Sequence, residues 1–172
     1  MKVLLLELGD IPPRLSATVL ENLPSPYRGG KVKQLALDME SCRDRQRGQV
    51  DAACLLQRIP LPPPGWTTLA LTGVDLFLPA LTYVFGVSQL SGFRGVLSLA
   101  RLQPEKKWPA TWPTFVRRTT VEAVHELGHT LGLVHCPLAE CPMHRTLWPE
   151  AIDLKHPEYC PVCLKAVSGS EP

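Results

Sequence analysis

Apolar residues recur with two different periods along the chain. Short apolar runs bounded by turn residues predict five strands, at residues 3–8, 32–37, 67–76, 83–90 and 95–102. Apolar side chains at helical spacing predict helices at residues 12–23, 47–59 and from about 115 to 131. The proline-rich run at residues 60–64 ends the second of these helices, because proline cannot continue the helical hydrogen bonds.

The order of these elements predicts the fold class. Strands that alternate with helices favour parallel neighbours, whereas the short loop at residues 91–94 predicts a hairpin between the last two strands. We therefore expect an α/β (α+β) single domain whose mixed, mostly parallel sheet ends in one antiparallel edge strand. Thr119 and Glu122 match a capping box within the third helix, so the start of that helix is open. Arg117 and Arg118 are expected on its solvated face.

Composition narrows the classes of partner. The chain has 172 residues, 45% hydrophobic and 20% charged, which suits one soluble domain. A formal net charge of +2 gives no support for nucleic acid or an anionic membrane as a partner. Glu7 interrupts the apolar N-terminal run, no cleavage site follows, and no stretch is long enough to span a bilayer. We expect a cytoplasmic monomer.

The segment HELGHTLGLVH at residues 125–135 carries the candidate chemistry. On a helix, His125 and His129 project from nearly the same face and can share one zinc ion. Gly132 stands where the helix should stop, and a positive φ there would turn the chain so that His135 returns as the third ligand. The alternative, a core helix with three unrelated histidines, requires this spacing to be accidental.

Glu126 is the candidate catalytic residue. It directly follows the first ligand, about 100° around the helix, so its carboxylate should lie beside the metal rather than on it. Three histidines leave a fourth zinc position for water, from which Glu126 can accept a proton as general base. The pattern therefore predicts a zinc-dependent hydrolase.

Four of the six cysteines form a second candidate metal site. Cys136 and Cys141, then Cys160 and Cys163 eighteen residues later, have the spacing of a closed four-cysteine zinc site with a structural role. The alternatives are two disulfides or reduced thiols. The remaining pair, Cys42 and Cys54, is expected to be buried free thiols, with a disulfide left open.

These residues resemble a known family. HELGHTLGLVHC is similar to the metzincin signature HExxHxxGxxH, and the added cysteine, Met143 and the Cys160–Cys163 pair resemble the archaemetzincins. The resemblance implies a zinc metallopeptidase with two zinc ions per chain and a methionine turn at Met143 beneath the catalytic zinc. It further implies an upper subdomain (residues 1–132), a lower subdomain (133–172) and recognition of an extended peptide by the strand at 83–90.

Three functions compete at this point. The first is a peptidase, either endopeptidase or aminopeptidase, that acts on peptides or proteins. The second is a catalytically silent binding module that has kept its metal frame, against which the intact Glu126 argues. The third is a zinc hydrolase of another amide or an ester, because the same activated water would serve those bonds.

Overall fold

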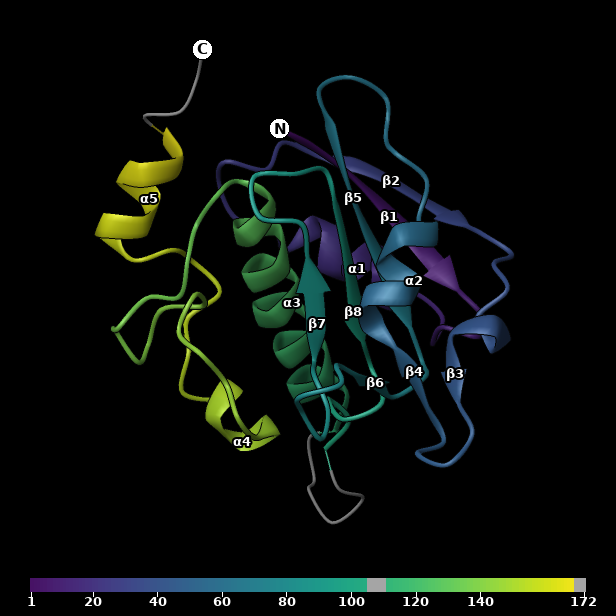
Figure 1. The fold of residues 1–172 in the computed structure, drawn as a ribbon. Helices are drawn as coiled ribbons and strands as arrows, with labels where there is room; N and C mark the ends of the chain where they lie inside the picture. Colours follow the sequence, from purple (N-terminus) through teal and green to yellow (C-terminus); the bar gives the residue numbers. More distant parts are fainter. Residues whose placement is uncertain (105–110, 169–172) are drawn as a thin grey trace.

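A central mixed sheet organises the molecule (Figure 1). The computed structural model describes residues 1–104 and 111–168. Within this part of the chain the sheet has five strands, in the spatial order β2 (Gly30–Gln34), β1 (Lys2–Leu8), β5 (Trp66–Thr72), β8 (Arg94–Ser98) and β7 (Gly86–Ser88). Every pairing is parallel except that of β7 with β8. The predicted sheet with one antiparallel edge strand is therefore confirmed.

The inner strands are buried on both faces, which is typical of parallel sheets. In β1, Val3 and Leu5 join the hydrophobic cluster on one face, and Leu6 and Leu8 join the cluster on the other. The alternation follows from the two-residue period of a strand. Each face therefore needs a helical cover.

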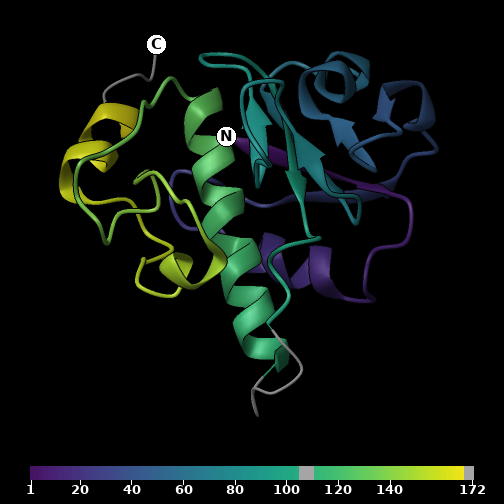
Figure 2. The same ribbon diagram turned by 60° about the horizontal axis from the view of Figure 1, so that its bottom comes forward.

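Helices supply that cover. Those that cover the sheet are α1 (Leu15–Glu21), α2 (Ala52–Arg58) and α3 (Thr111–Thr130). The described chain also has α4 (Pro149–Ile152), α5 (Pro161–Ser168) and a short 3-10 turn, η1 (Glu40–Cys42). Residues of α1 and α3 lie in one cluster, and those of α2 lie in the other. Figure 2 shows α3 running along one face of the sheet with α2 beyond the other. None of the helices in the described ranges is long and apolar enough to cross a membrane.

The second predicted helix is shorter than expected. The predicted range 47–59 begins instead with β4 (Gln49–Asp51), which pairs with β3 (Arg43–Asp44) and β6 (Leu76–Phe77) in a small second sheet. The side chain of Asp51 then caps α2 by accepting from the backbone amides of its first turn. A long-range pairing thus replaces the first turn that periodicity predicts.

The structure answers one open question about α3 and corrects one expectation. The helix already includes Thr111, so the open alternative of a start at the Thr119 capping box is excluded: the Thr119 Oγ1 donates to the Phe115 carbonyl one turn earlier. Arg118 is buried rather than solvated, and its guanidinium binds the Asp153 carboxylate at 2.6 Å. The partner lies 35 residues further along the chain, where no local pattern could indicate it.

Cys42 and Cys54 form a disulfide, which corrects the expectation of free thiols. The turn η1 and the helix α2 are packed together, and the two Cα atoms lie 5.7 Å apart. That separation is within the range that a disulfide spans.

The segment that follows α3 lies on the side of the helix away from the sheet (Figure 2). It runs mainly without regular structure through α4 to α5. Of the predicted lower subdomain, residues 169–172 lie outside the described part of the chain.

Candidate metal centres and active site

Three histidines converge at the end of α3. His125 and His129 are one turn apart on the helix, and their Nε2 atoms lie 3.1 Å from each other. His135 comes from the following loop, with its ring centroid 5.3 Å and 5.1 Å from the other two. One ring nitrogen from each histidine lies within 4.8 Å of the others. Three nitrogens this close suit the coordination shell of a single zinc ion.

The turn at Gly132 brings the third histidine back. Gly132 has φ +90°, a backbone conformation that residues with a Cβ rarely adopt. Its amide donates to His129 O at 2.9 Å, and the amide of Leu133 donates to Gly128 O at 3.0 Å. These hydrogen bonds end α3 and reverse the chain direction. His135 therefore returns to the side of α3 that carries His125 and His129.

Backbone carbonyls fix the two helical imidazoles. His125 Nδ1 donates to Pro142 O at 2.7 Å, and His129 Nδ1 donates to Leu133 O at 2.8 Å. A carbonyl can only accept, so each Nδ1 carries the proton and each Nε2 keeps its lone pair for a metal. Burial lowers the pKa of all three histidines, His135 included. The site therefore presents neutral imidazoles, the form that binds zinc.

Glu126 lies beside this group and is almost fully buried. Its Oε2 accepts a 2.6 Å hydrogen bond from Ser88 Oγ on β7. Burial raises the pKa of Glu126 to about 8; the bond from Ser88 opposes this rise and the charge of Glu122 adds to it. A divalent cation at the imidazoles would favour the ionised carboxylate. This arrangement suits a group that gains and loses a proton.

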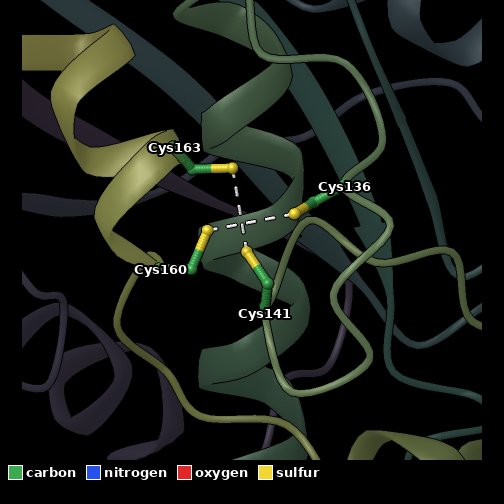
Figure 3. A group of neighbouring side chains, drawn as sticks. All are labelled: Cys136, Cys141, Cys160 and Cys163. Carbon is green, nitrogen blue, oxygen red and sulfur yellow. Dashed lines mark hydrogen bonds between the residues drawn. The ribbon is translucent and has the colours of Figure 1, made fainter.

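Four thiols form a second compact group between α3 and α5 (Figure 3). Cys136 and Cys141 come from the loop after α3, Cys160 directly precedes α5, and Cys163 lies in its first turn. The Cys136 and Cys160 sulfurs are 3.9 Å apart, and those of Cys141 and Cys163 are 3.8 Å apart. Tetrahedral zinc with bonds of about 2.3 Å requires sulfurs about 3.8 Å apart, whereas a disulfide requires about 2.05 Å. The donor set therefore fits a metal ion, and the alternative of two disulfides is wrong.

The thiols differ in acidity: burial raises the pKa of Cys141 and of Cys163, whereas the pKa of Cys160 is lowered. Burial raises the pKa of Cys160, but hydrogen bonds from the Cys163 amide and from the neighbouring thiols outweigh it and lower the pKa to about 7. A thiol with this pKa is partly thiolate at neutral pH, and the thiolate is the ligand form.

Met143 connects the two groups of candidate ligands. It is fully buried, and its carbonyl accepts from the amide of Cys136 at 2.9 Å. Its thioether packs directly on the helix at Gly128, where an added Cβ would lie 2.4 Å from the sulfur. The absence of a side chain at Gly128 lets the methionine segment approach α3 this closely.

Sequence reasoning missed a buried polar pair next to the site. Lys155 is 1% exposed and donates to the carbonyls of Pro142, at 3.2 Å, and His144, at 2.6 Å. Its ammonium also lies 3.7 Å from the Glu122 carboxylate. The Pro142 carbonyl is the same one that fixes His125. Lys155 lies in a loop without a motif, so no signal in the sequence identifies it.

A cleft of about 600 Å³ opens beside the three histidines and Glu126. One wall is the strand segment that includes β7, and the other is the loop after Met143. The two walls meet where Tyr83 Oη donates to the Leu147 carbonyl. Apolar side chains contribute much of the lining, and they include Leu78, Leu81, Val84, Phe85, Leu90 and Val134. Within the described residues β7 has a neighbour on only one side, so its outer edge is available along this cleft.

Comparison with known proteins agrees with this architecture. Residues 62–168 match the family model described as peptidase family M54. An archaemetzincin from Methanocaldococcus jannaschii is 38% identical over 69% of this chain and 66% of its own length. One from Thermococcus kodakarensis is 34% identical over 94% and 92% of the two chains. The crystal structure of archaemetzincin from Methanopyrus kandleri superposes with a TM-score of 0.85 at 30% identity, covering 98% of this chain and 94% of that one. The chain therefore belongs to peptidase family M54, the archaemetzincin family of zinc metallopeptidases.

Proposed function

We propose that the chain hydrolyses peptide bonds at a zinc ion held by His125, His129 and His135. The observation that carries this proposal is the convergence of three neutral imidazoles beside the buried carboxylate of Glu126, at the floor of an open cleft. Zinc bound by three protein ligands keeps an open position, lowers the pKa of its water to roughly 7 and polarises a carbonyl.

Glu126 is the proposed general base. Its carboxylate follows the first ligand and is not one of the three converging donors, so it is free to accept a proton from water. The same carboxyl group can then pass that proton to the leaving amine. Because burial favours its protonated form, Glu126 can hold the proton between the two steps.

A second zinc ion is proposed at Cys136, Cys141, Cys160 and Cys163. Four thiolates would fill a tetrahedral shell and leave no position for substrate, so this ion would be structural. The ion would hold α5 against the loop that carries His135. His135 directly precedes Cys136 in this loop.

The substrate is proposed to be a peptide or protein segment in extended form. The outer edge of β7 offers unpaired backbone groups to such a segment, and the apolar lining of the cleft suits apolar side chains. In this arrangement residues 1–132 form the upper subdomain above the cleft and residues 133–172 the lower subdomain.

A peptide-library digest with zinc-loaded protein tests the proposal, with Glu126→Gln as the inactive variant and Glu140→Gln as the control. Glu140 is an exposed acid whose nearest ionic partner, His156, is 4.0 Å away. We expect cleavage by the wild type and by Glu140→Gln, and zinc binding without cleavage by Glu126→Gln. Turnover of esters or other amides in place of peptides would move the chain to another class of zinc hydrolase, and full activity of Glu126→Gln would place the base elsewhere.

A further inference from the structure

Two small residues of β7 face the carboxylate of Glu126. Gly86 and Ser88 are two residues apart, so they lie on the same face of the strand, and Val87 points to the other. Val87 packs against the hydrophobic cluster on the α2 side of the sheet. The face that carries Gly86 and Ser88 is therefore the one that meets α3.

Each of the two residues constrains a different oxygen of Glu126. Ser88 Oγ donates to Oε2 at 2.6 Å. Gly86 leaves the space next to Oε1: a Cβ at this position would lie 2.6 Å from Oε1 and 2.7 Å from the carboxyl carbon. One oxygen is thus anchored by a hydrogen bond, and the other occupies room that any side chain at position 86 would fill.

We infer that Ser88 and Gly86 are positioning residues for Glu126, which orient its carboxylate for proton transfer. The inference rests on the proposed function. Ser88 occupies Oε2, so Oε1 is the oxygen left to accept the proton of water. Without the anchor, the flexible glutamate side chain would sample other rotamers.

The anchor lies on the strand that is proposed to bind the substrate backbone. A peptide paired with the outer edge of β7 and the carboxylate held by its inner face would therefore share one rigid element. The substrate backbone would be held by hydrogen bonds to β7, and Glu126 is held by Ser88 of the same strand. The scissile bond and the carboxylate of Glu126 would therefore keep a constant relative position.

Ser98 provides a matched control. It lies on the adjacent strand β8, is buried, and its Oγ donates to the Val74 carbonyl at 2.7 Å. Replacing Ser88 or Ser98 with alanine removes a hydroxyl and the short hydrogen bond that it donates. Ser98 Oγ also accepts from the Ala100 amide at 3.2 Å, but only Ser88 touches Glu126.

The experiment compares Ser88→Ala, Ser88→Thr and Ser98→Ala in the zinc-loaded protein. For Ser88→Ala we expect kcat to fall about 10- to 100-fold, because a hydrogen bond to a charged group is lost, while KM and zinc content stay within about twofold. Ser88→Thr keeps the hydroxyl and should retain most of the activity. Ser98→Ala should lower the melting temperature and leave kcat unchanged.

A second readout does not depend on turnover. A crystal structure of zinc-loaded Ser88→Ala should show the Glu126 carboxylate rotated away from its wild-type position or in more than one rotamer. The inference is overturned if the carboxylate stays in place, or if Ser88→Ala retains wild-type kcat. Absence of hydrolysis by the wild type would instead refute the proposed function, and the carboxylate position would still decide whether Ser88 anchors Glu126.

Gly86→Ala tests the spatial half of the inference. Its Cβ would also lie 2.6 Å from the Val96 carbonyl, so the melting temperature is measured alongside kcat. We expect the zinc-loaded variant structure to show Oε1 displaced from its wild-type position; an unmoved carboxylate would contradict the role of Gly86.

Discussion

The ammonium group of Lys155 lies 3.7 Å from the carboxylate of Glu122, and neither side chain reaches solvent, at 1% and 3% exposure. Burial raises the pKa of Glu122 and lowers that of Lys155, while their mutual attraction opposes both changes. Lys155 also donates to the Pro142 carbonyl that fixes His125. The pair therefore connects the interior of α3 to the loop that supports a metal ligand.

Removing one member of this pair should be costly. Glu122→Gln leaves the buried ammonium of Lys155 without its counter-charge, and we expect the free energy of unfolding to fall by roughly 3–5 kcal/mol. Urea denaturation measures the change. Glu140→Gln, which removes an exposed carboxylate, should change stability by less than about 1 kcal/mol. Equal effects of the two variants would show that Lys155 does not need Glu122.

Metal removal should separate the two candidate centres. We expect two zinc ions per chain by metal analysis, and a chelator should first remove the ion at the histidines, since His135 is exposed and the site opens to the cleft. That loss should abolish hydrolysis with little change in the far-ultraviolet circular dichroism spectrum.

Loss of the ion at the cysteines should instead unfold the region after α3, because the four thiols come from two separated segments of it. Cys163→Ser is expected to bind one zinc and to expose this region to proteolysis, whereas His135→Ala should keep the cysteine-bound zinc. A wild-type content of one zinc or none would contradict both expectations.

Gly128→Ala should destabilise the protein, although replacing glycine with alanine in a helix usually stabilises it. Alanine in place of glycine ordinarily stabilises a helix interior by about 1 kcal/mol. Here the added Cβ would lie 2.4 Å from the Met143 sulfur, and we expect a net loss of about 1–3 kcal/mol through overpacking. Thermal unfolding provides the measurement. In the double variant Gly128→Ala/Met143→Ala the two losses should be clearly less than additive, and simple additivity would argue against this contact.

The Asp75–Arg101 pair should make a pH-dependent contribution to stability. Burial acts to raise the pKa of Asp75, but hydrogen bonds from Arg101 and Gln49 outweigh it and lower the pKa. A carboxyl group whose pKa is lower in the folded than in the unfolded state stabilises the fold at pH values above its unfolded-state pKa of about 3.9. This stabilisation is lost as the pH falls through the folded-state pKa.

Asp75→Asn should therefore be less stable than the wild type at pH 7, by up to about 1 kcal/mol because the pair is partly exposed. The difference should shrink below about pH 4. Urea denaturation at both pH values tests this, with the exposed acid variant Glu21→Gln as the control. A difference that is constant with pH would show that the charge of Asp75 is not responsible.

Local spacing was sufficient to predict the parts of the site that one segment builds. His125 and His129 are one helical turn apart, and Gly132 is the residue type that the turn requires, so their arrangement depends on a few consecutive residues. Short apolar runs bounded by turn residues likewise predicted β1, β5 and β8. These features rest on backbone geometry that is fixed within a few residues.

Contacts between distant segments were decided only by the tertiary structure. Ser88 meets Glu126 across 38 residues, Lys155 meets Glu122 from a loop without a motif, and Cys42 pairs with Cys54 because η1 packs on α2. Each of these partners depends on which elements pack together, and periodicity carries no information about that choice. The sequence alone therefore determined the helix that carries the candidate ligands, whereas the packing of β7 and of the loops after α3 decided which side chains surround them.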